Sequence, residues 1–345
     1  MIVAVAAAPS YGHLQRLTTD LGLYEHASLD EPRPEHGYCV DDVSRALVLL
    51  CREPDLNSHT HAMLDLYLNF TLAAISDNGA CHNRMDVDGF WTDQPGRGDW
   101  WGRALWALGI AAVHAPKEEQ RSRALTGFRL LAQTTSPDLM AISFAALGAG
   151  ELLLSQPREF SAQKIVLAAH ARLTLRGTDS EWLWPEPRLR YSNGSIAEAV
   201  MLIGLALHDP TVIKQGVLML DFLIGIETRL GRFSVTPVGG RGPGETEVGY
   251  DQQPIEIAAI ADACARAWTI TGNSKWLDEL RRAWSWFLGN NDGGVPMFDP
   301  ETGAGYDGLH ARGPNRNQGA ESTLAMLSTA QAAYRHSVTT WKFQD

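Results

Sequence analysis

The sequence predicts an all-α fold in which twelve helices form an inner and an outer ring, and two patterns support this prediction. Segments that are apolar on nearly all sides alternate with segments that have one polar face. Helices of the first kind are buried and helices of the second kind lie at the surface. The connection after each apolar segment is short, whereas the one before it is mostly long. Six helical hairpins of this kind form an (α/α)6 toroid with long loops, and room for small β-hairpins, on one face.

The inner ring is predicted from a polar turn, an Asp or Asn and an apolar helix, an order that returns along the chain. Its first occurrence is His36 to Leu50, where Asp41 and Asp42 open the helix. An Asp or Asn at a helix start accepts backbone N–H bonds as an N-cap. We predict such caps at Asp41, Asp99, Asn193, Asp251 and Asn317. The predicted inner helices cover residues 42–51, 99–113, 138–154, 195–207, 252–269 and 318–334.

The outer ring is predicted from segments 117–134, 161–175, 211–226 and 274–288, each with one polar face. Segments 10–24 and 58–75 complete the twelve helices with a less regular pattern. A helical solenoid is the main alternative, but it usually lacks such a difference between its loops. Since no linker, charge run or low-complexity segment divides the chain, residues 1–345 are predicted to form a single toroid domain.

Composition excludes several classes of partner. The formal net charge of -11 argues against nucleic acid and anionic membranes, because both require a basic face. The four cysteines are widely separated without a CxxC motif, which favours reduced thiols in the cytoplasm. The apolar start lacks a basic region, and no apolar run is long enough to cross a bilayer. We therefore expect a soluble, cytoplasmic protein.

A toroid brings the first turns of its inner helices together beneath the long loops, so polar side chains there should share one pocket. Asp42 stays free for chemistry if Asp41 is the cap. Glu321 interrupts an apolar helix, and Glu186 lies in a rigid Trp-Pro-Glu-Pro loop. The candidate catalytic residues are Asp42, Glu186, Asp251 and Glu321. The candidate substrate-binding residues are Asp41, Trp91, Asp99, Trp100, Trp101, Trp182, Trp184, Tyr191, Asn193, Gln252, Glu256, His310, Asn317 and Gln318.

These residue types suit an uncharged sugar. Tryptophan stacks on the apolar face of a sugar ring, while carboxylates and amides bind its hydroxyl groups. Two carboxyl groups can then act as acid and base across a glycosidic bond. Structural roles compete with this interpretation: any single cap residue is more simply a cap, and Glu256 or Glu321 can pair with Arg266 or Arg316. Neither a metal-ligand spacing nor a phosphate-binding loop is present, so no metal and no cofactor are predicted.

The pattern resembles the six-hairpin glycosidase-like superfamily, whose members are (α/α)6 toroids. Residues 36–46 and 315–323 are similar to segments of an uncharacterised toroid that accompanies glycosyltransferases and mannan-processing enzymes in some bacteria. The resemblance implies glycan chemistry and association with glycan-processing enzymes. Superfamily members commonly act by inversion. This implies Glu186 or Glu321 as the acid and Asp42 or Asp251 as the base.

Four functions are therefore open. The first is an inverting glycoside hydrolase for oligosaccharides or other glycans, without a metal. The second is a sugar epimerase or isomerase, which uses histidines on the inner face, although the predicted inner helices have no histidine in their first turns. The third is a phosphorylase, for which His310, Arg312 and Arg316 offer a phosphate pocket. The fourth is a non-catalytic glycan-binding toroid.

Overall fold

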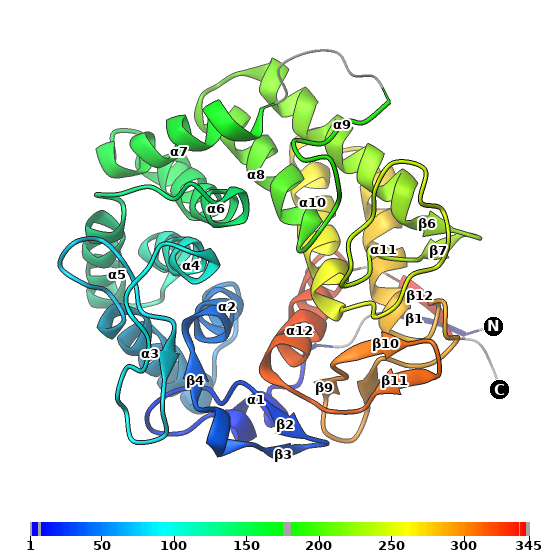
Figure 1. Cartoon of the computed structure of the whole chain (residues 1–345), viewed down its shortest axis with the longest axis horizontal. Coiled ribbons are helices and arrows are strands. Elements are labelled where there is room, and N and C mark those ends of the chain that lie inside the picture. Colours follow the sequence, from blue (N-terminus) through cyan, green and yellow to red (C-terminus); the bar gives the residue numbers. More distant parts are fainter. Residues whose placement is uncertain (1, 6–7, 175–180, 338, 343–345) are drawn as a thin grey trace.

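The computed structural model describes residues 2–5, 8–174, 181–337 and 339–342. Figure 1 looks along the axis of two concentric rings of helices and confirms the predicted (α/α)6 toroid. The inner ring contains α2 (Val40–Cys51), α4 (Asp99–His114), α6 (Leu139–Ser155), α8 (Asn193–Ala206), α10 (Pro254–Thr271) and α12 (Ala320–Arg335). The outer helices are α1 (Gly12–Leu17), α3 (Ser58–Ala73), α5 (Glu118–Leu131), α7 (Phe160–Leu173), α9 (Pro210–Glu227) and α11 (Lys275–Phe287).

The ends of two predicted outer helices differ from the prediction or lie outside the described residues. The first was predicted over residues 10–24, but α1 ends at Leu17. The Thr19 hydroxyl accepts the backbone N–H groups of Leu21 and Gly22, which closes a turn instead of continuing the helix. For the helix predicted over 161–175, residue 175 lies outside the described residues.

Short antiparallel strand pairs occupy the loops. They are β2 (Ala27–Ser28) with β3 (Glu31–Pro32), β4 (Tyr38–Cys39) with β5 (Arg84–Met85), β6 (Thr228–Arg229) with β7 (Arg232–Phe233), β8 (Phe298–Asp299) with β9 (Ala304–Gly305), and β10 (Gly308–His310) with β11 (Gly313–Asn315). In addition, β1 (Ile2–Val5) pairs with β12 (Thr339–Lys342), so that Ile2 lies opposite Lys342. Apart from β1 and β12, these strands and η1, a 3-10 turn at Pro34–His36, lie in the segments that precede the inner helices.

The five predicted side-chain caps are wrong. The N-cap residues of α2, α4, α8, α10 and α12 are Cys39, Gly98, Ser192, Gln253 and Gly319, and none of these makes a side-chain cap bond. Asp41 and Asp99 already lie in the first helical turn. Asn317 accepts the backbone N–H of Leu29 and so joins two loops. The polar residues at these helix starts therefore make tertiary contacts or face the bore instead of closing their own helix.

Glycine permits the closest contact between inner helices. A Cβ atom at Gly109 of α4 would collide with the carbonyl oxygen of Gly148 of α6, whereas one at Gly225 of α9 would meet nothing within 4 Å. We expect Gly109→Ala to lower the free energy of unfolding by about 1–3 kcal/mol, because the packed helices must separate. The matched change Gly225→Ala should raise it by roughly 0.5–1 kcal/mol, since alanine restricts the unfolded chain. Urea unfolding of both variants tests this, and equal effects would contradict it.

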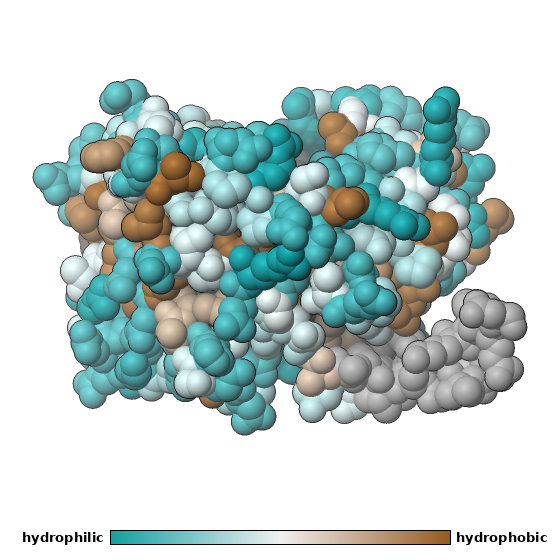
Figure 2. Space-filling model, turned by 90° about the horizontal axis from the view of Figure 1, so that it is seen from below, coloured by the Kyte–Doolittle hydropathy of each residue, from teal (hydrophilic) through white to brown (hydrophobic). Residues whose placement is uncertain are grey.

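The face of the molecule in Figure 2 is mostly polar. Figure 2 shows one side of the ring, where polar residues cover most of the face and apolar residues are scattered. Within the described residues, every helix is too short or too polar to span a membrane. All four cysteines are buried and unpaired.

Candidate functional site

A cavity of about 450 Å³ opens where the inner helices begin. This lies in the range of roughly 300–1,000 Å³ in which small ligands bind. The residues that line it come from the first two turns of α2, from the first turns of α4 and α12, and from the segments before α2, α4, α8, α10 and α12. They are Glu25, His26, Cys39, Asp41, Asp42, Arg45, Arg84, Asp99, Tyr191, Asp251, Gln253, Asp307, Asn315, Gly319, Glu321 and Ser322.

The structure brings together six of the residues that the sequence singled out. These are Asp41, Asp42, Asp99, Tyr191, Asp251 and Glu321. Asp41 and Glu321 are 280 positions apart in the sequence. The six residues share one cavity because their elements meet at one end of the bore. The other predicted site residues do not line it, for reasons that differ between the aromatic and the polar ones.

The predicted wall of tryptophans is absent, and Tyr191 and His26 are the aromatic residues among the described lining. Trp101 has 0% exposure and donates its indole N–H to the carbonyl of Gly79. The other four indoles are also turned toward neighbouring loops and outer helices. Trp100 donates to the carbonyl of Cys81, Trp91 stacks on His82, and Trp182 and Trp184 pack against Phe222. Burial of large apolar rings therefore prevails over exposure to a ligand.

Glu256 has a structural role, contrary to the prediction that it binds substrate. It is 3% exposed, and its carboxylate accepts the backbone N–H groups of Ser192 and Asn193 at the start of α8. The side-chain amide of Asn193 donates to the same carboxylate. Burial and the nearby Glu227 raise the pKa of Glu256 to about 8. This carboxyl group joins α10 to α8 below the cavity wall.

The remaining predicted residues lie beside the cavity. Gln252 pairs through its backbone with Leu309 of β10 and donates its side-chain amide to Asp292, which fixes the position of the neighbouring Asp251. Gln318 donates to Asp299, and Asn317 makes the loop contact given above. Glu186 lies 4.0 Å from Arg190 outside the lining. His310 lines an adjacent, more open space, with its Nδ1 3.7 Å from Asp251 Oδ1.

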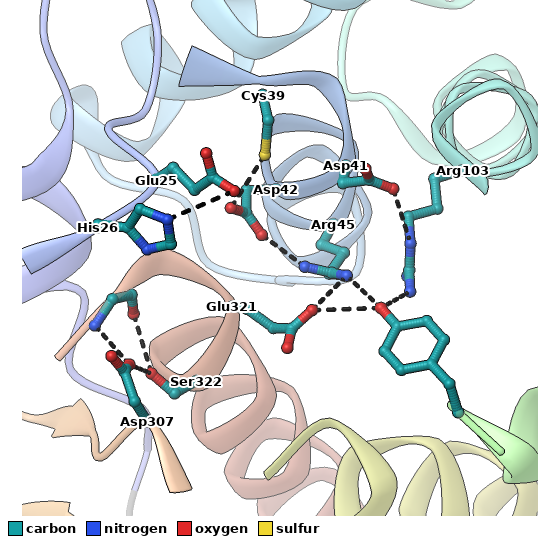
Figure 3. A network of polar contacts seen from close by, with 12 residues as sticks. Glu25, His26, Cys39, Asp41, Asp42, Arg45, Arg103, Asp307, Glu321 and Ser322 are labelled. Atoms are coloured by element: carbon teal, nitrogen blue, oxygen red, sulfur yellow. Dashed lines mark hydrogen bonds and ion pairs between the residues drawn. The ribbon is translucent and has the colours of Figure 1, made fainter. Parts of the chain in front are cut away.

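Arg45 is the centre of the polar network at the base of the cavity (Figure 3). Its Nη1 donates to Asp42 Oδ1, and its Nη2 lies 2.6 Å from Glu321 Oε2. The same nitrogen donates to the Tyr191 hydroxyl oxygen at 2.7 Å, and that hydroxyl donates to Glu321 at 3.2 Å. Arg103 donates to Tyr191 as well, while its Nε lies 3.1 Å from Asp41 Oδ1. Two guanidinium groups and one phenol thus hold three carboxylates from α2 and α12 in fixed positions.

The cavity is strongly acidic. Seven carboxyl groups line it, against two arginines and one histidine. Burial raises the pKa of Asp99 to about 6, and it also raises the pKa values of Asp251 and Asp307 above their ordinary range. Crowding and partial desolvation thus move the pKa values of these carboxyl groups toward neutral pH, which favours acid–base catalysis.

Asp42 is both the most buried carboxyl of the cavity and the least available to a ligand. Its oxygens accept bonds from Arg45 and from the Cys39 thiol, whose Sγ is 3.1 Å away. Burial raises its pKa from 3.8 to about 7 in spite of Arg45. Glu25, Cys39 and Asp42 have ligand atoms within 4.8 Å of one another and so could share a cation. However, Asp42 and Cys39 are already hydrogen-bonded, and burial raises the pKa of Cys39 well above its usual value, which keeps the thiol protonated.

The raised pKa of Asp42 predicts a pH-dependent stability. Between about pH 4 and about pH 7 the folded protein keeps a proton on Asp42 that the unfolded chain releases. The contribution of Asp42 to the free energy of unfolding is therefore fully present below about pH 4 and is lost as the pH rises to about 7. Asp42→Asn should remove this loss. Its free energy of unfolding, relative to the unchanged protein, should therefore increase between pH 5 and pH 8. Urea unfolding at both pH values tests this, and a difference independent of pH would contradict it.

Several lining residues escaped the sequence prediction. Glu25, His26, Arg84 and Asp307 lie in long connections, away from any helix start. No spacing relates them to the inner helices, because the β-hairpins determine which loop residues reach the cavity. Gln253, Gly319 and Ser322 were nearer to detection, since each lies within two residues of a predicted site residue.

The sequence matches no protein-family profile and no curated protein. Solved structures, however, share the fold over nearly the whole chain. A sugar epimerase from a ruminal bacterium has a TM-score of 0.72 at 13% identity, covering 94% of this chain and 95% of that one. Cellobiose 2-epimerase from Bacillus thermoamylovorans B4167 also has a TM-score of 0.72, at 11% identity and 95% coverage of both chains. A GH76 α-mannanase from Bacteroides thetaiotaomicron has a TM-score of 0.62 at 12% identity, with 93% and 92% coverage.

These similarities establish the class of fold. The protein is an (α/α)6 toroid, a fold that it shares with these two epimerases and this mannanase. At such low identities the similarity concerns the fold alone, so the activity has to be argued from the cavity.

Proposed function

We propose that this protein is a glycoside hydrolase that acts on oligosaccharides with inversion at the anomeric carbon. The observation that carries the proposal is one acidic cavity that both Asp99 and Asp251 line. Asp99 begins α4 and Asp251 precedes α10, and Figure 1 shows these two helices facing each other across the ring. Inverting enzymes place two carboxyl groups on opposite faces of the sugar, with a water molecule beside one of them.

Asp251 is the proposed acid, in place of the role as base that the resemblance implied for it, and Asp99 is the proposed base. Both carboxyl groups keep oxygen atoms available to a ligand. Asp251 Oδ1 has no hydrogen-bond partner and lies 3.7 Å from His310 Nδ1, and Asp99 makes no hydrogen bond to the described residues. Burial raises the pKa of Asp251 above its ordinary range; the nearby His310 opposes this shift and Asp307 adds to it. A pKa of about 6 leaves Asp99 mostly ionised at neutral pH yet more basic than an ordinary aspartate.

The proposed reaction is a single displacement at the anomeric carbon. Asp251 gives its proton to the glycosidic oxygen as the bond from that oxygen to the anomeric carbon breaks. A water molecule attacks the anomeric carbon from the opposite face and gives a proton to Asp99. Glu321, which Arg45 and Tyr191 hold in place, stabilises positive charge that develops on the sugar. Asp42 acts through Arg45 and is a positioning residue.

The names of the structural relatives suggest the first substrates to test, because they mention cellobiose and mannan. We expect hydrolysis of a cello- or manno-oligosaccharide, with the first product of opposite anomeric configuration. Proton NMR in the first minutes of reaction measures this before mutarotation. Retained configuration would contradict the assignment of acid and base, and cleavage of neither series would contradict hydrolysis of these glycans. The predicted association with glycan-processing enzymes and the cytoplasmic location stay predictions.

A sugar epimerase or isomerase is the second candidate, and two observations favour it. The epimerases have higher TM-scores than the mannanase, and His26 and His310 lie in or next to the cavity. An imidazole near pH 7 can remove the proton beside the carbonyl of an open-chain sugar. Incubation of cellobiose or mannose in D2O tests this. Deuterium at C2 that His26→Ala abolishes would favour the second candidate over hydrolysis.

A further inference from the structure

The bore of the toroid is closed to sugars below the cavity. Under Arg45 it narrows to a space of about 40 Å³, whose wall includes Val48, Trp106 and Leu324. A water molecule needs roughly 10–15 Å³, so this throat admits a few waters and no sugar ring. A second space of about 350 Å³, which includes Arg52 and Asp262, lies beyond it at the other end of the inner helices. The cavity of about 450 Å³ at the start of the inner helices is therefore closed at its inner end to a glycan, and we call it the blind pocket.

A second, more open space adjoins the mouth of this pocket. It measures about 560 Å³ and is lined by Tyr250, Asp251, His310, Ala311, Arg312, Gly313 and Pro314. The hairpin of β10 and β11 supplies most of this wall. Gly308 of β10 allows the Asp251 carboxylate to pack directly on the hairpin, because a Cβ atom there would lie 2.5 Å from Asp251 Oδ1.

Asp251 is the residue that the two spaces have in common. A glycan that occupies both spaces must therefore place one of its glycosidic bonds next to this carboxyl group. The part of the glycan in the blind pocket is a terminal unit, since the throat blocks any continuation. The part in the open space is the remainder of the chain, which can extend into solvent.

Asp99, the proposed base, lines the blind pocket and is not among the residues that line the open space, so the anomeric carbon that water attacks belongs to the unit in the blind pocket. A terminal unit that is cleaved at its own anomeric carbon is the non-reducing end. We propose that the protein acts at the non-reducing end of its glycan and removes the terminal unit, while the adjoining sugar lies on Tyr250 and the hairpin of β10 and β11. This inference rests on the proposed hydrolysis for the reaction and for the end that is cleaved, but the blind pocket and the open space are independent of it. Tyr250 is 39% exposed beside Asp251. It offers the aromatic face on which a sugar can stack, the role that the sequence analysis gave to the tryptophans.

The product pattern tests the inference if hydrolysis occurs. With cellohexaose or mannohexaose as the substrate, we expect the monosaccharide and the pentaose as the first products. Early di-, tri- and tetrasaccharides would show cleavage inside the chain, which would overturn the inference while leaving the proposed hydrolysis intact. Capping the non-reducing end of the hexaose with a 4,6-O-benzylidene group should abolish cleavage.

Binding tests the inference if hydrolysis does not occur. Calorimetry should show that the capped hexaose binds at least tenfold more weakly than the free hexaose, and equal affinity would overturn the inference. Tyr250→Ala should weaken binding of the free hexaose at least tenfold. The control Tyr334→Ala, at the far end of α12 and 46% exposed, should change it less than twofold. Equal effects of the two variants, or no binding of either hexaose, would also overturn it.

Discussion

Asp251→Asn is expected to reduce kcat/KM for an unactivated oligosaccharide by about 10²–10⁴-fold, the usual contribution of a general acid. The amide keeps the size of the side chain but has no acidic proton for the leaving oxygen. Folding should be unaffected, because backbone hydrogen bonds between Gln252 and Leu309 hold this segment in place and do not involve the Asp251 side chain. The ratio of kcat/KM values for the variant and the unchanged protein measures the effect.

The leaving group distinguishes an acid from any other role of Asp251. The leaving group of a 2,4-dinitrophenyl glycoside, 2,4-dinitrophenolate, departs without protonation. Asp251→Asn should therefore reduce the hydrolysis of this glycoside far less than that of the oligosaccharide. The same comparison for Asp99→Asn should show a large loss with both substrates. Dependence on the leaving group in Asp99→Asn, and none in Asp251→Asn, would mean that the two roles are exchanged.

Glu186→Gln is the matched control. Glu186 was a candidate acid from the sequence, since it lies in a rigid loop beside tryptophan, but the structure places it outside the cavity lining. Its variant should retain activity within about twofold, well below the smallest loss expected of an acid. A loss comparable to that of Asp251→Asn would contradict the site described here.

The fold was predictable because hydrophobic periodicity is a local property with a direct physical meaning. Segments such as 138–154, which is apolar all round, can only be buried, and α6 at Leu139–Ser155 is indeed in the inner ring. The order of buried and half-buried helices then leaves few arrangements. By contrast, the assignment of Asp41 and Asp99 as caps failed because helix starts differ by one or two residues between pattern and structure.

The cavity residues were predictable only in a helix start or within a few residues before it, as Tyr191 and Asp251 are. Asp41, Asp42, Asp99 and Glu321 follow from the toroid, because the first turns of inner helices converge. Glu25 and Asp307 reach the cavity through loop conformations that their own sequence does not specify. The tryptophans were misplaced since a long loop must bury its own apolar rings, and Trp182 and Trp184 do so against Phe222 of α9.

Arg45→Met should have the largest effect on stability of any change in the cavity. The methionine fills part of the space of the guanidinium stem but leaves Asp42 and Glu321 without their cation. Breaking a buried ion pair in this way costs about 3–5 kcal/mol of unfolding free energy. Arg33→Met is the control: Arg33 pairs with Glu35 at the surface, and its loss should cost at most about 1 kcal/mol.

The pH dependence of Arg45→Met identifies the cause of its loss of stability. At pH 8 the buried carboxylates are charged and unpaired, whereas at pH 5 Asp42, whose pKa is about 7 even beside Arg45, accepts a proton. The cost should therefore be smaller at pH 5. Adding Asp42→Asn removes one of the unpaired charges, so the double variant should be more stable at pH 8 than Arg45→Met alone. Urea unfolding of the four combinations measures the coupling, and additive effects at both pH values would show that Arg45 stabilises the fold by packing and not by its charge.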